Sequence, residues 1–128
     1  MTQIENLDHK FRKDYQKGQL LESDVDPDPF QQFKRWFDDI IAVTPEQPNA
    51  MILSTVDDQN QSHSRVVLLK ELDSKGFCFY SNYASTKGQA MSQNEHVALL
   101  FFSMTLQRQI HVNGRVEKLD YDQSNDYF

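Results

Sequence analysis

The residues best suited to chemistry are cations that could hold an anionic ligand. Arg65 and Lys70 bracket the apolar stretch RVVLLK, and their odd separation places them on opposite faces of an extended strand. Arg65 then shares its face with Val67 and Leu69. Because Lys and Arg are seldom buried unless they are paired, the simpler interpretation of this segment is two strand-end charges that reach solvent.

A second segment, YSNYASTKG at 80–88, joins a strand to the start of a helix. Exposed backbone N–H groups at a helix start, together with hydroxyl groups and Lys87, favour an anion site. The alternative is an ordinary capped turn with a surface lysine. If Arg65 lies beside Lys87, a guanidinium fork and an ammonium point charge would together suit a phosphate dianion.

Polar residues on a later strand offer a third candidate. Gln109 and His111 share one face of that strand, which is either a plain solvent face or, for Gln109, a hydrogen-bonding partner of a heterocycle. The four histidines, His9, His63, His96 and His111, lack the spacing of metal ligands, so no metal site is expected. No catalytic residue is assigned, because no nucleophile motif or Gly-rich nucleotide loop occurs. Any redox chemistry would need a cofactor.

Size and charge restrict the class of protein. The chain has 128 residues, which suits one domain over 1–128, and its formal net charge is −6. That charge argues against unspecific nucleic-acid binding. Cys78 is the only cysteine, so an internal disulfide is excluded. No apolar run suits a signal peptide or a membrane span, and a cytoplasmic location is expected.

A helix is expected after a polar, charged arm over 1–28, which itself should contain a short helix around Ile4 to Lys17 that ends at Gly18. Asp28 suits the N-cap, Pro29 the first helical position, and Gln31 would complete a capping box. The helix should end at Pro45. Its apolar face should comprise five residues at helical spacing: Phe30, Phe33, Phe37, Ile40 and Ile41.

Strand-like alternation follows the helix. Five strands are predicted, at 50–56, 62–71, 77–82, 96–103 and 107–119, with turns at 57–61 and 73–76 and a short helix at 85–94. The stretch Val97 to Phe102 is apolar on both faces, so a helix or a second subunit should cover the face that is not in the core. The order of elements predicts a small antiparallel barrel.

The motifs, taken in order, resemble the pyridoxamine 5'-phosphate oxidase family from about Phe11 to Phe128. Any one of the matching segments would be a weak signal, but five in the family's order are specific. They are FRKDYQKGQL at 11–20, DPDPFQQFKRWF at 26–37, SRVVLLKELDSKGFCFYSN at 64–82, STKGQAMSQN at 85–94 and TLQRQIHVNGRVEKL at 105–119.

The resemblance implies a mainly β fold of the α+β type: an FMN-binding split β-barrel with peripheral helices. It also implies a homodimer with FMN at the interface, a flexible arm over 1–28 and a barrel core over 29–128. The residues implied to bind FMN are Arg65, Val66, Val67, Leu68, Leu69, Lys70, Tyr80, Ser81, Thr86, Lys87 and Gln109. Those implied to bind substrate are Arg12, Lys13, Asp14, Tyr15, Lys70 and Tyr127.

The activity that the resemblance implies is oxidation of pyridoxamine or pyridoxine 5'-phosphate to pyridoxal 5'-phosphate. Two electrons would pass to the flavin, and dioxygen would reoxidise it. The protein's part would be positioning, charge placement and exclusion of water.

Two departures from the family pattern keep alternatives open. Thr86 stands where the family commonly has arginine, and the family continues past Phe128 with further strands, so the barrel core is expected to be incomplete, truncated at the C-terminus. The alternatives are a non-catalytic FMN- or pyridoxal-phosphate-binding module, which the missing end favours, and another split-barrel flavin reductase. The arm at 11–20 and Tyr127 favour the oxidase over the reductase.

Overall fold

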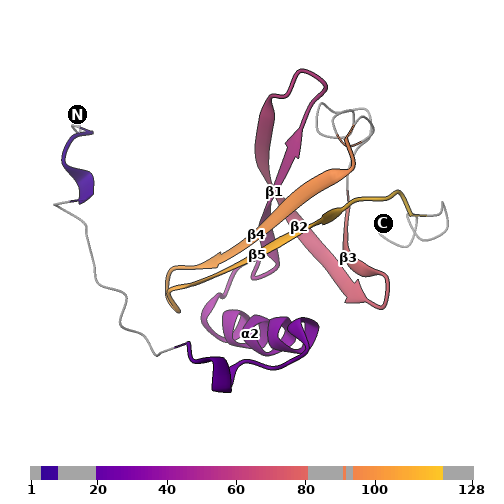
Figure 1. Ribbon diagram of the computed structural model, residues 1–128. Coiled ribbons are helices and arrows are strands. Elements are labelled where there is room, and N and C mark those ends of the chain that lie inside the picture. The colour runs from indigo at the N-terminus through magenta and orange to yellow at the C-terminus, as the bar shows by residue number, and fades with distance from the viewer. Residues whose placement is uncertain (1–3, 9–19, 81–90, 92–93, 120–128) are drawn as a thin grey trace.

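The structure of the chain is a computed structural model that describes residues 4–8, 20–80, 91 and 94–119. Its centre is one antiparallel sheet with the strand order β3-β2-β1-β4-β5, and a helix, α2, lies across one end of the strands (Figure 1). The elements are η1 Glu22–Asp24, α2 Pro29–Val43, β1 Ala50–Val56, β2 Ser62–Asp73, β3 Gly76–Phe79, β4 His96–Ser103 and β5 Arg108–Arg115.

Most of the predicted strands are confirmed, with changes at their ends. The bounds of β1 and β4 are those predicted, whereas β5 is shorter than the predicted 107–119. Gln107 has a φ of 56°, in the left-handed region that suits a turn, so the strand starts only at Arg108. Past Arg115 the chain keeps one sheet-like bond, from the Val116 N–H to the Glu95 carbonyl.

The second strand is two residues longer than predicted because it contains a β-bulge. The pairing with β3 shifts between Leu69 and Glu71, which leaves Lys70 as the extra residue. The bulge reverses the alternation, so that Leu72 returns to the core side opposite Phe77. Lys70 therefore lies at a local bend of β2.

Helix α2 starts where the sequence predicts, with Asp28 as its N-cap and Pro29 in the first turn. The Asp28 carboxylate accepts a hydrogen bond from the Phe30 N–H at 2.9 Å. The predicted capping box with Gln31 is wrong. The Asp28 N–H instead donates to Asp26 Oδ1 at 2.9 Å, two residues away, and this short turn leaves no donor for Gln31.

The predicted apolar face of α2 is confirmed in its centre. Phe33 and Ile40 are buried and Phe37 is partly buried, but Phe30 and Ile41 lie at the edges of the face and are about half exposed. The helix therefore packs through one narrow stripe.

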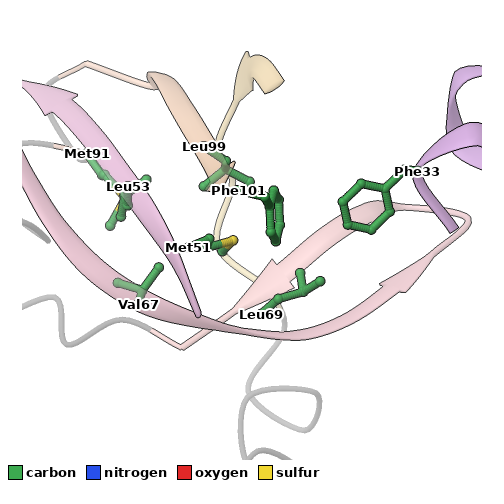
Figure 2. Packing of buried hydrophobic residues seen from close by; sticks show 8 residues of the cluster. All are labelled: Phe33, Met51, Leu53, Val67, Leu69, Met91, Leu99 and Phe101. Carbon is green, nitrogen blue, oxygen red and sulfur yellow. The ribbon is translucent and has the colours of Figure 1, made fainter. Parts of the chain in front are cut away.

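The core lies between α2 and the inner face of the sheet. The ring centroids of Phe33 and Phe101 are 5.0 Å apart in an edge-to-face arrangement, and Figure 2 shows the Phe101 ring between Phe33 and Met51. The buried cluster comprises Phe33, Met51, Leu53, Val67, Leu69, Met91, Leu99 and Phe101. Burial of this apolar surface is the main stabilising term of the fold.

Several expectations fall outside the described part of the chain. These are half of the arm over 1–28, most of the helix at 85–94, and residues 120–128. Of the arm, the structure describes 4–8, which is exposed, and 20–28, which includes η1. None of the described helices has the length and apolar character of a membrane span.

Candidate anion-binding site

Arg65 shares the face of β2 that carries Val67 and Leu69, as the alternation predicts, and this is the inner face. It pairs with Leu53 of β1 in the register of the sheet, and its guanidinium reaches across to that strand. Nη1 donates to the Leu53 carbonyl at 3.1 Å, and Nη2 donates to Thr55 Oγ1 at 2.9 Å. The side chain is half-buried, so its charged end is fixed in place rather than free in solvent.

No carboxylate of the described residues forms an ion pair with Arg65. Among the four arginines that the structure describes, Arg35, Arg108 and Arg115 each pair with an aspartate or glutamate, and Arg65 does not. Loss of solvent lowers the pKa of the Arg65 guanidinium from its ordinary value, although an arginine stays charged in a protein. A half-buried cation with two neutral acceptors and three remaining N–H groups suits an anionic ligand.

Lys70 and Tyr80, two other predicted positions, come together at a cavity of about 400 Å³ between the edge strands β3 and β5. The bulge turns Lys70 toward this cavity, and Tyr80 follows the end of β3. The apolar part of the lining comes from the strands β3, β4 and β5, from α2 and from residues outside these elements: Phe30, Phe77, Phe79, Met91, Val97, Leu99, Val112, Val116 and Leu119. A flat apolar ligand with a polar edge would fit such a lining.

Val66 and Gln109 lie on the outer face of the sheet, away from the core. Val66 is 67% exposed and continues a row across the strands through Ile52 and Leu100 to His111. The predicted apolar character of β4 on both faces is seen here, because Phe102 on this outer face is 50% exposed. None of the described helices packs on the outer face, since α2 packs against the core side.

The remaining predicted positions divide into two groups. The side chains of Val67 and Leu69 are in the core, and Leu68 is partly buried on the outer face. A ligand beside this strand would meet the backbone of Val67 and Leu69 rather than their side chains. The other predicted positions lie outside the described residues: Arg12, Lys13, Asp14, Tyr15, Ser81, Thr86, Lys87 and Tyr127.

Sequence reasoning missed the two groups that hold Arg65. Thr55 is 1% exposed, on the inner face of β1 beside Met51 and Leu53. The sequence did contain a signal for Thr55, because its hydroxyl stands among apolar residues on the inward-facing side of the strand. A buried hydroxyl needs a hydrogen-bond partner, so a polar partner could have been predicted there. The Leu53 carbonyl could not have been found, since its role depends on the register between two strands.

The β1–β2 hairpin carries a separate polar pair. Asp57 Oδ2 lies 2.9 Å from His63 Nε2, and Asp57 Oδ1 accepts from the backbone N–H groups of Gln59 and Gln61. The hydrogen bond from His63, followed by that from Gln61, lowers the pKa of Asp57. These bonds close the turn predicted at 57–61.

Near the β2–β3 turn, ligand atoms of Glu71, Asp73 and Cys78 lie within 4.8 Å of one another. Burial, and then the charges of Asp73 and Glu71, raise the pKa of the Cys78 thiol. The thiol is therefore held in its protonated form, which is a poor metal ligand and a poor nucleophile.

The family model and two curated relatives that the chain matches carry closely similar descriptions. Residues 37–128 match the family model for pyridoxamine 5'-phosphate oxidase. Curated relatives named pyridoxine/pyridoxamine 5'-phosphate oxidase include one from Cupriavidus taiwanensis, 49% identical over 128 residues, and one from Trichormus variabilis, 45% identical over 117 residues. The match to the first relative covers the whole of this chain and 58% of the relative. The match to the second covers 91% of this chain and 55% of the relative.

Solved structures agree on the fold. PhzG from Burkholderia lata, in complex with tetrahydrophenazine-1-carboxylic acid, has a TM-score of 0.77 at 22% identity, over 84% of this chain and 55% of that one. A pyridoxamine 5'-phosphate oxidase-related, FMN-binding protein from Nostoc punctiforme has a TM-score of 0.61 at 12% identity, over 78% of this chain and 53% of that one. The predicted fold class, a mainly β split barrel, is confirmed.

The chain thus spans a little over half the length of the curated relatives that it matches. Within that span, the matched region includes the sheet, the half-buried Arg65 and the cavity beside Lys70 and Tyr80. On the family model and on the agreement of fold, the chain belongs to the pyridoxamine 5'-phosphate oxidase family.

Proposed function

We propose that this chain provides the FMN-binding framework of an oxidase that converts pyridoxamine or pyridoxine 5'-phosphate to pyridoxal 5'-phosphate. The observation that carries the proposal is the Arg65 guanidinium, which is half-buried, held by two neutral acceptors, and without a carboxylate partner among the described residues. In this proposal Arg65 binds the FMN phosphate. Family membership and the relatives' names support the choice of cofactor and substrate.

The residues present fit a bound flavin nucleotide. Toward the residues that the structure describes, the planar guanidinium uses two of its N–H groups, and its other three would suit a phosphate with several acceptor oxygens. Lys70, which is exposed at the bulge, would contact the flavin or the substrate phosphate. Bound FMN would supply two-electron redox chemistry, with dioxygen as the final acceptor.

The chain's own residues would bind FMN, orient it and shield it from water. Arg65 would bind the phosphate, and Lys70, which the bulge turns toward the cavity beside β3, would make a second ligand contact. The backbone of Val67 and Leu69 would contact the flavin, while their side chains hold the strand to the core. Gln109 lies on the outer face, on the other side of the sheet from Arg65, so it would meet a flavin only at the interface between two chains.

We further propose a homodimer that forms through the outer face of the sheet. Val66 is 67% exposed and Phe102 is 50% exposed, and Ile52 and Leu100 connect them into one apolar area. A contiguous apolar area of this kind is typical of an interface rather than of a solvent face. Gln109 would then lie at the interface, where the resemblance puts FMN.

The test uses the purified chain with added FMN. After dialysis the protein should keep its yellow colour, and pyridoxine 5'-phosphate added without oxygen should bleach the flavin absorbance. Readmission of air should restore the colour with release of peroxide. A protein that retains FMN but is never bleached would be a binding module without turnover, and a protein that retains no FMN would refute the proposal entirely.

A further inference from the structure

Thr55 is a hydroxyl group in a place where only apolar side chains would be expected. It is 1% exposed and shares the inner face of β1 with Met51 at 2% and Leu53 at 0%. Burial of a hydroxyl without a hydrogen bond is costly. The bond that the structure gives its Oγ1 comes from Arg65 Nη2, at 2.9 Å.

Two acceptors on β1 together fix the direction of the Arg65 guanidinium. Thr55 Oγ1 holds one terminal nitrogen, and the Leu53 carbonyl holds the other at 3.1 Å. A guanidinium is planar, so two bonds to its two ends fix the plane as well as the position. Nε–H and one N–H on each terminal nitrogen remain, and they all lie in that fixed plane.

We propose that Thr55 is a positioning residue, whose hydroxyl fixes the Arg65 guanidinium in the orientation that binds the phosphate of FMN. The inference rests on the proposed function, because it assumes that Arg65 meets a flavin phosphate. It adds a residue that does not touch the ligand. Because the guanidinium is ordered before the phosphate arrives, less conformational entropy is lost on binding.

A purely structural role for Thr55 predicts different behaviour. If the hydroxyl only satisfies the hydrogen bonding of a buried arginine, its loss should lower stability and affect all flavins alike. If it orders Arg65 for a phosphate, its loss should affect FMN, which carries a phosphate, and spare riboflavin, which carries none. The ratio of the two dissociation constants therefore separates the two roles.

The variant is Thr55→Val, which removes the hydroxyl and keeps the branched shape. Its matched control is Ser54→Ala, because Ser54 is the neighbouring hydroxyl on the opposite face of β1 and bonds Ser64 Oγ at 2.9 Å. Thr55→Ser is the rescue variant, since it restores an acceptor oxygen. Thr55→Cys, with a weakly accepting sulfur, serves if the valine variant fails to fold.

The measurement is quenching of flavin fluorescence, with FMN and with riboflavin, on the full chain. Thr55→Val should weaken FMN binding by about tenfold, the usual size of one hydrogen bond to a charged group, and change riboflavin binding by less than about twofold. Ser54→Ala should leave both unchanged, and Thr55→Ser should recover most of the FMN affinity. Thr55→Cys should shift the ratio in the same direction as Thr55→Val.

Failure of the inference differs from failure of the proposed function. If the unaltered chain binds FMN no better than riboflavin, the phosphate role of Arg65 is wrong. If the unaltered chain prefers FMN and Thr55→Val keeps the same ratio, or weakens both flavins equally, the positioning role is overturned while the proposed function stands.

Discussion

Replacement of Phe101 by alanine should remove the centre of the core. Phe101 is 1% exposed, and its ring centroid lies 5.0 Å from that of Phe33, 6.4 Å from Phe37 and 6.2 Å from Phe77. Burial of a phenylalanine side chain contributes about 1.5–3 kcal/mol, and each aromatic pair adds about 0.5–1.5 kcal/mol. With the cavity left behind, we expect a loss of about 3–5 kcal/mol in the free energy of unfolding.

Urea unfolding followed by far-UV circular dichroism measures this loss, and thermal unfolding should show a midpoint lower by about 12–20 °C for a domain of this size. Met104→Ala is the control, because Met104 is 65% exposed in the β4–β5 turn, and it should change stability by no more than about 0.5 kcal/mol. If Phe101→Ala does not fold, Phe101→Leu should cost about 1.5 kcal/mol. Equal stabilities for the Phe101 and Met104 alanine variants would refute the packing of α2 on this sheet.

Three further predictions concern the surface and the titrating groups. Val66→Lys should convert the dimer to a monomer in light scattering, while Ile41→Lys on α2 should not; a dimer that survives Val66→Lys would remove the outer face as the interface. Cys78 should react with a disulfide reagent at pH 8 far more slowly in the folded chain than in urea, because burial raises its pKa; equal rates would contradict that burial. Asp57 has a lowered pKa in the folded chain, so its stabilising effect is present above the unfolded-state pKa and is lost as the pH falls through the folded-state value. From pH 7 to pH 3 the unaltered chain should therefore lose more free energy of unfolding than Asp57→Asn, and parallel curves would be evidence against the bond to His63.

The sequence predicts strands well where alternation is bounded by turn residues. β1 has the predicted bounds, because its alternation ends at the Asp57 turn, and β4 has the predicted bounds too. The end of β5 was wrong because the polar residues around it fit a strand and a loop equally well. The extension of β2 depends on a bulge at Lys70, which is set by its pairing with β3 and leaves no mark in the local pattern.

Part of the site was also predictable from strand alternation. Strand alternation within RVVLLK put Arg65 on one face with Val67 and Leu69, and the structure confirms this and shows that the face is the inner one. The contact with Thr55 depends on the register of two strands, in which Leu53 pairs with Arg65. Long-range pairing of this kind is set by the whole sheet and by its turns, so a local pattern does not reveal it.

The most direct test of the account compares the FMN affinity of Arg65→Ala with that of Lys34→Ala. Arg65 is half-buried without a carboxylate partner among the described residues, whereas Lys34 is an exposed residue of α2 outside the lining of the cavity. Loss of charged hydrogen bonds to a phosphate costs about 1.5–3 kcal/mol, so Arg65→Ala should raise the dissociation constant by roughly ten- to a hundredfold. Lys34→Ala should leave it within about twofold of the unaltered chain. Equal affinities in the two variants would contradict the account, because they would remove Arg65 from the flavin phosphate.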